Sequence, residues 1–559
     1  MDNFSYNRRD FLKSGIAGLA GLGAAGSLLS TLQAVPVANA AKKGENQPNI
    51  ILFFTDQQRL SAIGAYGKTI CKTPNIDRLA ASGVRFENAY TACPLCSPAR
   101  ASVMTGQHIH THRVGANIGE YGCNNNQLPD SPDLLSRRLQ AVGYNCGYTG
   151  KWHLGDWPHG LKGSAMAKHY AMPSTRGFTG QDFSGHGDGG FGYDEYKQYL
   201  KKNGFEHKVR PHKKDGLTIR RYGILEGPVE STVPYFLANN TISMIDQFIQ
   251  GRQPFFIWHN NWGPHEPYYV PEKYYNMYKD MKIPQWENYN WRPQNPHGPD
   301  QLKRHPNVDK LQWQDWEESI RHYYAFATLI DEQIGRIIEH IEKKGIADNT
   351  IIIFSSDHGE TLGSHGGLVD KGWAHYEEMQ RIGLIVKDPR KPDTQNKSGK
   401  VRTELTSSLD LYPTILDYAK VDYDKKKIHG RSLVDLVEGK TTEWRDCVFV
   451  EFFGLGSMAT NMVTCRWKNI KYGYTCSNKD ELYDLEKDPY EMTNLLDDPA
   501  YAQTAEMMRR RIYTFMARTG YPGIANFMQF RLGYSYERQY IYGPDPVNIN
   551  SFLVDNMKL

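Results

Sequence analysis

The chain has 559 residues, of which 40% are hydrophobic and 23% are charged, the balance of an ordinary globular protein. At roughly 150 residues per domain this length corresponds to about three to four domain equivalents, which excludes a small stapled scaffold. Lys and Arg number 66 against 62 Asp and Glu, so a net charge of +4 gives no reason to expect binding to nucleic acid. The eight cysteines are too sparse for a disulfide framework.

The N-terminus has the pattern of an export signal. Arg8, Arg9 and Lys13 precede an uncharged stretch over 14–41 that ends near Ala38-Asn39-Ala40, a small-residue cleavage site. The stretch is rich in Gly and Ala and is less hydrophobic than a typical membrane span, so we predict a cleaved signal peptide over 1–40 and no stable membrane insertion afterwards. The pair Arg8-Arg9 resembles the twin-arginine signal, which implies that a twin-arginine translocase moves the folded protein to the periplasm or beyond.

Two apolar runs predict buried parallel strands with acidic ends. The run over 49–54 leads to Asp56, and the run over 350–356 leads to Asp357. Between them, apolar residues at three- and four-residue steps predict a helix from Trp313 to Lys344, with Gly345 as a cap. This alternation indicates an α/β fold with a large, mostly parallel sheet flanked by helices, and we assign it to a catalytic domain over 47–440. Carboxyl ends of parallel strands meet at one edge, so both aspartates are expected there.

The pattern of apolar and turn residues changes after residue 440. Short runs at 447–450, 471–474 and 481–485 are separated by turn residues, which predicts a small antiparallel sheet. A helical stretch near 501–517 follows, so we predict a smaller C-terminal subdomain over 441–520. The tail over 521–559 has no clear period.

The segment from Cys93 to Arg100 allows two interpretations. Cys93 and Cys96 form a C-x-x-C pair, as in redox proteins, whereas Cys96 to Arg100 forms C-x-P-x-R, the motif in which a maturase oxidises the cysteine to formylglycine. Pro98 fits the first turn of a helix, which places residue 96 at a helix N-terminus, where anions are stabilised.

Further motifs decide between the two. They are Thr55-Asp56-Gln57-Gln58-Arg59, Thr73-Pro74-Asn75-Ile76-Asp77-Arg78-Leu79, Gly150-Lys151-Trp152-His153-Leu154-Gly155, Pro264-His265-Glu266-Pro267 and Ser356-Asp357-His358-Gly359-Glu360. Together with C-x-P-x-R, and in this order, they resemble the type I sulfatases of the alkaline phosphatase superfamily from Pro48 to about Pro499. The resemblance implies an alkaline-phosphatase-like fold and hydrolysis of sulfate esters.

The resemblance also implies the cofactors. Cys96 would be converted to 3-oxoalanine, the formylglycine residue, and one divalent cation, calcium, would be held by Asp56, Gln57, Asp357, His358 and an oxygen of residue 96. Oxygen donors suit such an ion. Gln57 and His358 stand where many sulfatases have Asp and Asn, and the imidazole of His358 is a less natural calcium ligand.

The catalytic side chains that the resemblance implies are Cys96, Arg100, Lys151, His153, His265, Asp357 and Lys371. A hydroxyl of hydrated formylglycine would attack sulfur with help from Asp357, and His153 would later deprotonate the second hydroxyl. His265 and Lys371 would protonate or neutralise the leaving oxygen, while the cations crowd around the anionic ester.

Two insertions suggest a sulfated small molecule or oligosaccharide as substrate. Between Lys201 and Arg221, eight basic residues stand against two acidic ones, a local charge of +6. The basic residues are Lys201, Lys202, Lys208, Arg210, Lys213, Lys214, Arg220 and Arg221. Trp286 and Trp291 lie in a loop rich in Pro and Asn and are the better candidates for stacking on sugar faces, whereas Trp313 and Trp316 are expected to pack inside. The basic segment is equally well interpreted as a solvated surface loop or as a wall that binds a sulfated glycan. Two alternatives stay open: a phosphonate monoester or phosphodiester hydrolase of the same superfamily, and a noncatalytic periplasmic binder of sulfated glycans.

Overall fold

The structure is a computed structural model, and it describes residues 47–119, 125, 127–155, 170–211, 219–291, 307–390, 400–440, 443–455, 458–476, 478–532, 553–555 and 557–559. The predicted signal peptide and Lys213 and Lys214 lie outside these residues. None of the helices in the described ranges is both long and apolar enough to cross a membrane.

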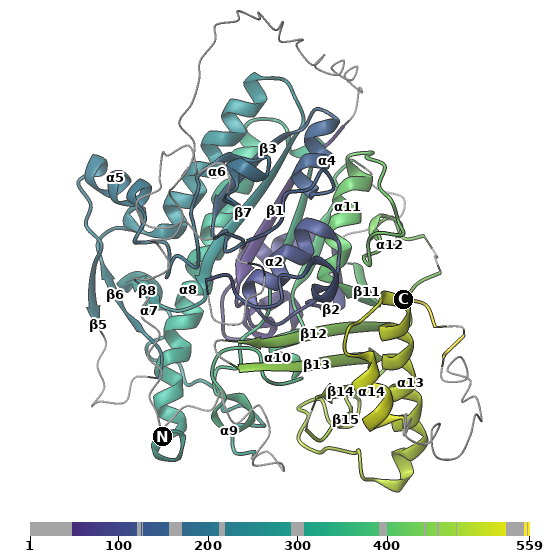
Figure 1. The fold of residues 1–559 in the computed structure, drawn as a ribbon. Coiled ribbons are helices and arrows are strands. Elements are labelled where there is room, and N and C mark those ends of the chain that lie inside the picture. The colour runs from purple at the N-terminus through teal and green to yellow at the C-terminus, as the bar shows by residue number, and fades with distance from the viewer. Residues whose placement is uncertain are drawn as a thin grey trace, which may run out of the picture. The chain divides into compact units, whose positions relative to one another are not determined.

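The main sheet has eight strands in the order β11-β2-β10-β9-β1-β7-β3-β4 (Figure 1). Every neighbouring pair is parallel except the two that β10 makes with β9 and β2. Its strands are β1 (Asn49–Asp56), β2 (Val84–Tyr90), β3 (Asn145–Gly150), β4 (Thr179–Gly180), β7 (Phe255–Pro264), β9 (Thr350–Ser356), β10 (Leu384–Lys387) and β11 (Lys400–Ser407). A mixed, mostly parallel sheet is the predicted fold class, and it is confirmed.

Helices cover both faces of this sheet. Because successive side chains of a strand point to opposite faces, β1 sends Ile50, Leu52 and Phe54 into one core and Ile51 and Phe53 into the other. The first core is completed by α2 (Cys96–Thr105), α4 (Leu135–Ala141) and α11 (Leu411–Tyr418), and the second by α1 (Pro74–Ser82), α6 (Val233–Gln250) and α8 (Trp313–Lys343). Both faces of the sheet are buried, which explains the continuous apolar strand sequences.

The long helix α8 matches its prediction. It begins at Trp313 and ends at Lys343, and Gly345 beyond it has a φ of +68°, the left-handed conformation expected of a glycine after a helix. Trp316 is 1% exposed and Trp313 8% exposed, so both pack inside as expected. The remaining helices are α3 (Ile109–His112), α5 (Asp194–Asn203), α7 (Glu272–Tyr275), α9 (Ser364–Gly367), α10 (Glu377–Gln380) and α12 (Val434–Val437).

Two smaller sheets accompany the large one. Antiparallel strands β12 (Cys447–Leu455), β13 (Met458–Trp467), β14 (Ile470–Thr475) and β15 (Glu481–Asp484) form the predicted C-terminal sheet. The sequence prediction missed β13, whose Thr, Arg and Asn residues interrupt the apolar pattern. A three-stranded sheet of β5 (Lys208–Pro211), β6 (Tyr222–Glu226) and β8 (Tyr268–Pro271) was not predicted either.

The C-terminal sheet packs against the main sheet. Val448 and Val450 of β12 form one apolar cluster with Tyr90 of β2 and Leu405 of β11. On the other face of the small sheet lie α13 (Ala502–Thr519), close to its predicted bounds, and α14 (Ile524–Arg531), a helix within the tail that had no clear period. The boundaries at residues 440 and 520 stay predictions.

Candidate active site

Four adjacent parallel strands deliver polar residues to one edge of the main sheet. Asp56 ends β1, Asp357 follows β9, Lys151 follows β3 and His265 follows β7. The strands β3 and β7 approach so closely that a Cβ at Gly150 would lie 1.6 Å from the carbonyl oxygen of Asn260. The expectation that Asp56 and Asp357 meet at one edge is confirmed, because both carboxylates accept a hydrogen bond from the guanidinium group of Arg100.

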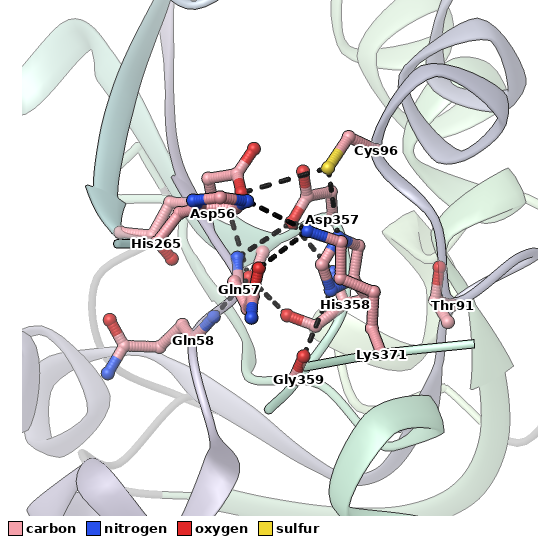
Figure 2. Close-up of polar contacts among 12 residues, drawn as sticks. Asp56, Gln57, Gln58, Thr91, Cys96, His265, Asp357, His358, Gly359 and Lys371 are labelled. Carbon is pink, nitrogen blue, oxygen red and sulfur yellow. Dashed lines mark hydrogen bonds and ion pairs between the residues drawn. The ribbon is translucent and has the colours of Figure 1, made fainter. Parts of the chain in front are cut away.

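Cys96 enters this edge from the first residue of α2 (Figure 2). Its Sγ lies 3.3 Å from Nε2 of His358, 3.5 Å from Nζ of Lys151 and 3.9 Å from Oδ1 of Asp56. The side chains of all these residues are buried.

Arg100 lies on the next turn of α2 and joins the two carboxylates. Its Nη2 donates to Oδ2 of Asp56 at 2.9 Å and to Oδ2 of Asp357 at 3.1 Å. Its Nη1 donates to Oδ1 of Asn260 and to the carbonyl oxygen of Lys151, both at 2.8 Å. Arg100 is 0% exposed, so it is a fixed internal cation that offsets the charge of the two carboxylates.

Electrostatics separate the two aspartates. Burial disfavours ionisation of Asp56, but Lys151 with His265 and Arg100 outweighs it and holds the pKa of Asp56 well below its ordinary value. Burial, together with the charge of Asp56, raises the pKa of Asp357 to about 7. The two carboxyls of the site therefore differ in how strongly they hold a proton.

The two cysteines of the C-x-x-C pair also differ in the pKa of their thiols. Burial and Asp56 disfavour the thiolate of Cys96, yet Lys151, Lys371 and His358 lower its pKa to about 7. Burial raises the pKa of Cys93 well above the ordinary value, and its side chain packs with Leu95. Both thiols are free, and only Cys96 lies among the charged residues of the site.

Four buried side chains could hold a divalent cation. Donor atoms of Asp56, Cys96, Asp357 and His358 all lie within 4.8 Å of one another. The Nδ1–H of His358 donates to the carbonyl oxygen of Gly359 at 2.9 Å, which leaves Nε2 facing the other donors. Two carboxylates, one imidazole nitrogen and one atom of residue 96 fit a metal ion, with the carboxylates favouring a hard one.

The side chain of Gln57, the fifth predicted ligand, is hydrogen-bonded to Lys371, Asp370 and Glu360. Its Oε1 accepts from Nζ of Lys371 at 2.7 Å, and its Nε2 donates to Oδ1 of Asp370 at 3.0 Å and to a carboxylate oxygen of Glu360. The main-chain N–H of Gln57 donates to Oδ1 of Asp357 at 3.0 Å. Gln57 thus connects the carboxylates to Lys371.

Lys371 and His265 lie together beside this centre (Figure 2). Nζ of Lys371 is 2.8 Å from Nε2 of His265 and 3.2 Å from Oδ1 of Asp370. Asp370 and the other nearby anionic groups outweigh the burial of Lys371 and raise its pKa above the ordinary value, so it stays charged. Burial lowers the pKa of His265 well below its ordinary value, an effect that Lys371 reinforces.

His153 completes the predicted set. Its carbonyl oxygen accepts from Oγ of Ser97 at 2.5 Å, which ties the segment after β3 to the start of α2. Its ring is 1% exposed, and Nδ1 has no hydrogen-bond partner among the described residues. Burial, with Lys151, lowers the pKa of His153 well below the ordinary value, so it is a neutral imidazole. The structure thus brings every predicted site residue to this one edge.

Three residues near the centre were missed from the sequence. Glu360 is fully buried, bonds Gln57 and accepts from Nη2 of Arg220 at 3.0 Å. His186 lies with its Nε2 at 3.4 Å from that of His265. Glu360 ends the Ser-Asp-His-Gly-Glu motif, which was a usable signal, and Arg220 belongs to the basic segment, whereas His186 comes from a segment without a motif.

The fold pairs part of the basic segment between Lys201 and Arg221, whereas Lys213 and Lys214 lie outside the described residues. Acidic residues from outside this segment neutralise half of its basic residues. The pairs are Lys208 with Glu226, Arg210 with Glu226 and Glu272, Arg220 with Glu360 and Glu266, and Arg221 with Asp188. These four residues therefore have structural partners, and the role of the remaining four in binding a polyanion stays a prediction.

The two candidate platform residues, Trp286 and Trp291, both take part in packing. The indole N–H of Trp286 donates to the carbonyl oxygen of Leu362 at 2.8 Å, and its ring lies against Trp313 and beneath Arg59. The indole N–H of Trp291 donates to the carbonyl oxygen of Met492 at 2.5 Å. Both rings are half-buried packing residues that join loops to the body of the protein.

Comparisons with known proteins identify the family. The Sulfatase family model matches residues 48–421, and a second model, N-sulphoglucosamine sulphohydrolase, C-terminal, matches residues 363–518. The chain belongs to the sulfatase family. It is a sulfuric ester hydrolase in the alkaline phosphatase superfamily, as its motifs predicted.

Relatives and solved structures cover most of this sulfatase. An arylsulfatase of Clostridium perfringens is 28% identical over 83% of the chain and 93% of the relative. An N-acetylglucosamine-6-O-sulfatase of Bacteroides thetaiotaomicron is 28% identical over 85% of the chain and 87% of the relative. The crystal structure of a phosphonate monoester hydrolase of Agrobacterium radiobacter superposes with a TM-score of 0.68 at 26% identity, over 84% of this chain and 96% of that one.

Proposed function

We propose that this enzyme hydrolyses sulfate esters of a carbohydrate, with residue 96 as formylglycine and one divalent cation, calcium, beside it. The observation that carries this proposal is the position of Cys96: a buried side chain at a helix N-terminus, within 4 Å of Asp56, His358 and Lys151. The carbohydrate is supported by relatives such as the N-acetylglucosamine-6-O-sulfatase.

The metal ion would be held by Asp56, Asp357, His358 and an oxygen of residue 96. Gln57, the fifth proposed ligand, would join them by exchanging the hydrogen bond that its Oε1 accepts from Lys371 for the ion. When bound, the ion supplies positive charge that offsets the carboxylates and polarises a sulfate oxygen. The chain keeps three further cations, Arg100, Lys151 and Lys371, around the same space.

In the first step, one hydroxyl of the hydrated residue 96 attacks sulfur. Asp357, whose carboxylate lies in the same donor cluster as residue 96, accepts the hydroxyl proton. A bond forms between sulfur and the oxygen of residue 96, and the bond from sulfur to the leaving oxygen breaks. The pair of His265 and Lys371 neutralises or protonates that oxygen, while Lys151 stabilises the sulfate group.

In the second step, the other hydroxyl of residue 96 loses its proton to His153. The neutral ring of His153, with its Nδ1 unused, suits it for a base. The carbon–oxygen bond to the sulfate breaks, the aldehyde of residue 96 is restored, and sulfate leaves without attack of water on sulfur. Water then hydrates the aldehyde for the next cycle.

Maturation and export belong to the same proposal. A maturase would oxidise Cys96 in the cytoplasm before a twin-arginine translocase, recognising Arg8 and Arg9, delivers the folded enzyme to the periplasm or the medium. Burial of Cys96 supports this order, because a folded chain leaves residue 96 0% exposed.

A second candidate function is hydrolysis of phosphonate monoesters or phosphodiesters. It is favoured by the TM-score of 0.68 to the phosphonate monoester hydrolase, obtained at 26% identity. Turnover of sulfated sugars and aryl sulfates, measured in parallel with a phosphate diester and a phosphonate monoester, separates the two. We expect the highest kcat/KM on a sulfated sugar, and a preference for the phosphorus esters would contradict the proposal. Mass analysis of the peptide containing residue 96 tests the noncatalytic alternative, in which the thiol persists.

A further inference from the structure

A glycine-rich segment, 184–190, places His186 next to the residues assigned to the leaving group. The segment is pressed against Trp262: a Cβ at Gly190, where φ is +84°, would lie 2.7 Å from the indole ring. The indole N–H of Trp262 donates to the carbonyl oxygen of His186 at 2.8 Å. The main chain of His186 is therefore fixed at a specific place on the rim of the site.

Arg221 holds this segment from the other side. Its guanidinium group bonds both carboxylate oxygens of Asp188, at 3.1 Å and 2.6 Å. One function of the basic insertion is thus structural, since it secures the wall that carries His186.

The ring of His186 has a defined proton position. The main-chain N–H of Asp188 approaches Nδ1 at 3.4 Å, so Nδ1 is an acceptor and Nε2 carries the hydrogen of the neutral ring. The ring packs edge-on against His153 at a centroid distance of 5.0 Å. The charge of Lys151, together with burial, lowers the pKa of His186 and so favours the neutral form.

The Nε2–H of His186 faces Nε2 of His265, which already accepts a hydrogen bond from Lys371. His265 donates from Nδ1 to the carbonyl oxygen of Glu266 at 2.8 Å, so its Nε2 is the acceptor. That nitrogen accepts from Nζ of Lys371 at 2.8 Å, and His186 reaches it only at 3.4 Å. A substrate oxygen placed between these three side chains is a better acceptor for His186 than His265 is.

We propose that His186 contacts the substrate and donates the Nε2 hydrogen bond to the leaving-group oxygen, as a third group beside His265 and Lys371. The inference rests on the proposed sulfate ester hydrolysis. Negative charge grows on the leaving oxygen as its bond to sulfur breaks, and a donor there stabilises the transition state. The benefit is largest for an alcohol leaving group such as a sugar hydroxyl, and small for a nitrophenolate, which carries negative charge readily.

The test compares two substrates and two variants of similar side-chain length. In His186→Leu the donor is lost, whereas in His186→Gln an amide N–H lies close to the position of Nε2. We expect His186→Leu to lower kcat/KM for a sugar 6-sulfate about 30-fold and for 4-nitrophenyl sulfate less than about 3-fold. His186→Gln is expected to stay within about 5-fold of the wild type on both substrates.

His207→Leu is the matched control. His207 is a partly buried histidine whose ring stacks on Phe191 at 4.8 Å, with no described contact to the site residues. It is expected to leave both kcat/KM values unchanged, and thermal unfolding of all variants verifies that they fold.

Equal losses on both substrates in His186→Leu, or no loss on the sugar sulfate, would overturn the assignment of His186, as would failure of His186→Gln to restore the sugar sulfate activity. The proposed function fails separately, if the wild type cleaves no sulfate ester. If the enzyme cleaves phosphonate monoesters instead, the same comparison of alcohol and nitrophenol leaving groups on those esters still tests His186.

Discussion

Replacing Arg100 by methionine tests how the buried charges of the site are balanced. The guanidinium group lies 2.9 Å from Asp56 and 3.1 Å from Asp357, and all three side chains are 0% exposed. Methionine fills much of the same volume but leaves two buried carboxylates without their shared cation, a loss of about 3–5 kcal/mol. With an unfolding entropy of about 2.1 cal/mol/K per residue over roughly 500 residues, this corresponds to a fall in Tm of about 4 °C.

The assay is thermal unfolding of the metal-stripped enzyme, followed by addition of Ca²⁺. Because the ion supplies the positive charge that Arg100→Met removes, Ca²⁺ is expected to raise the Tm of the variant more than that of the wild type. Arg85→Met is the control, since Arg85 makes a partly exposed pair with Glu87 at 3.2 Å and its loss costs less than about 1 °C. An Arg100→Met enzyme with the wild-type Tm in the absence of metal would refute this account of the site.

Three further predictions concern the nucleophile, the metal and pH. Cys96→Ala is expected to abolish turnover while its Tm stays within about 2 °C of the wild type. Cys93→Ala, at an equally buried cysteine, is expected to keep activity. An active Cys96→Ala enzyme would contradict the role of residue 96. Exhaustive chelation, verified by elemental analysis, is expected to remove activity, and Ca²⁺ to restore it; full activity of the metal-free enzyme would end the metal proposal. His375 is buried between Thr464 and Thr475. Burial, reinforced by Lys471, lowers the pKa of His375 to about 3. Below pH 6.5 only the unfolded chain therefore binds a proton on this residue, and the free energy of unfolding falls by about 1.4 kcal/mol per pH unit. Between pH 7 and pH 5 the Tm of His375→Gln is therefore expected to fall about 2 °C less than that of the wild type, and identical slopes would show that His375 is protonated in the folded state.

The sequence alone determined the elements with strong local patterns. The apolar runs ending in Asp56 and Asp357 are strands because both faces of the sheet are buried, and such runs need no partner to be recognised. Helix α8 follows from its spacing of apolar residues and from Gly345. The site residues were available for the same reason, since they stand in short motifs at strand ends and at the start of a helix.

Only the tertiary structure decided which charges remain unpaired and which rings remain free. The basic segment up to Arg221 was expected to attract polyanions, and Asp188, Glu226 and Glu360 from other parts of the chain pair with three of its residues, Arg221, Lys208 and Arg220. Trp286 and the other expected platform residue were likewise used for packing. Ion pairing and packing depend on residues that are distant in sequence, and a local pattern holds no information about those partners. His186 was invisible for the same reason: its chemistry comes from its position beside His265, which the fold alone creates.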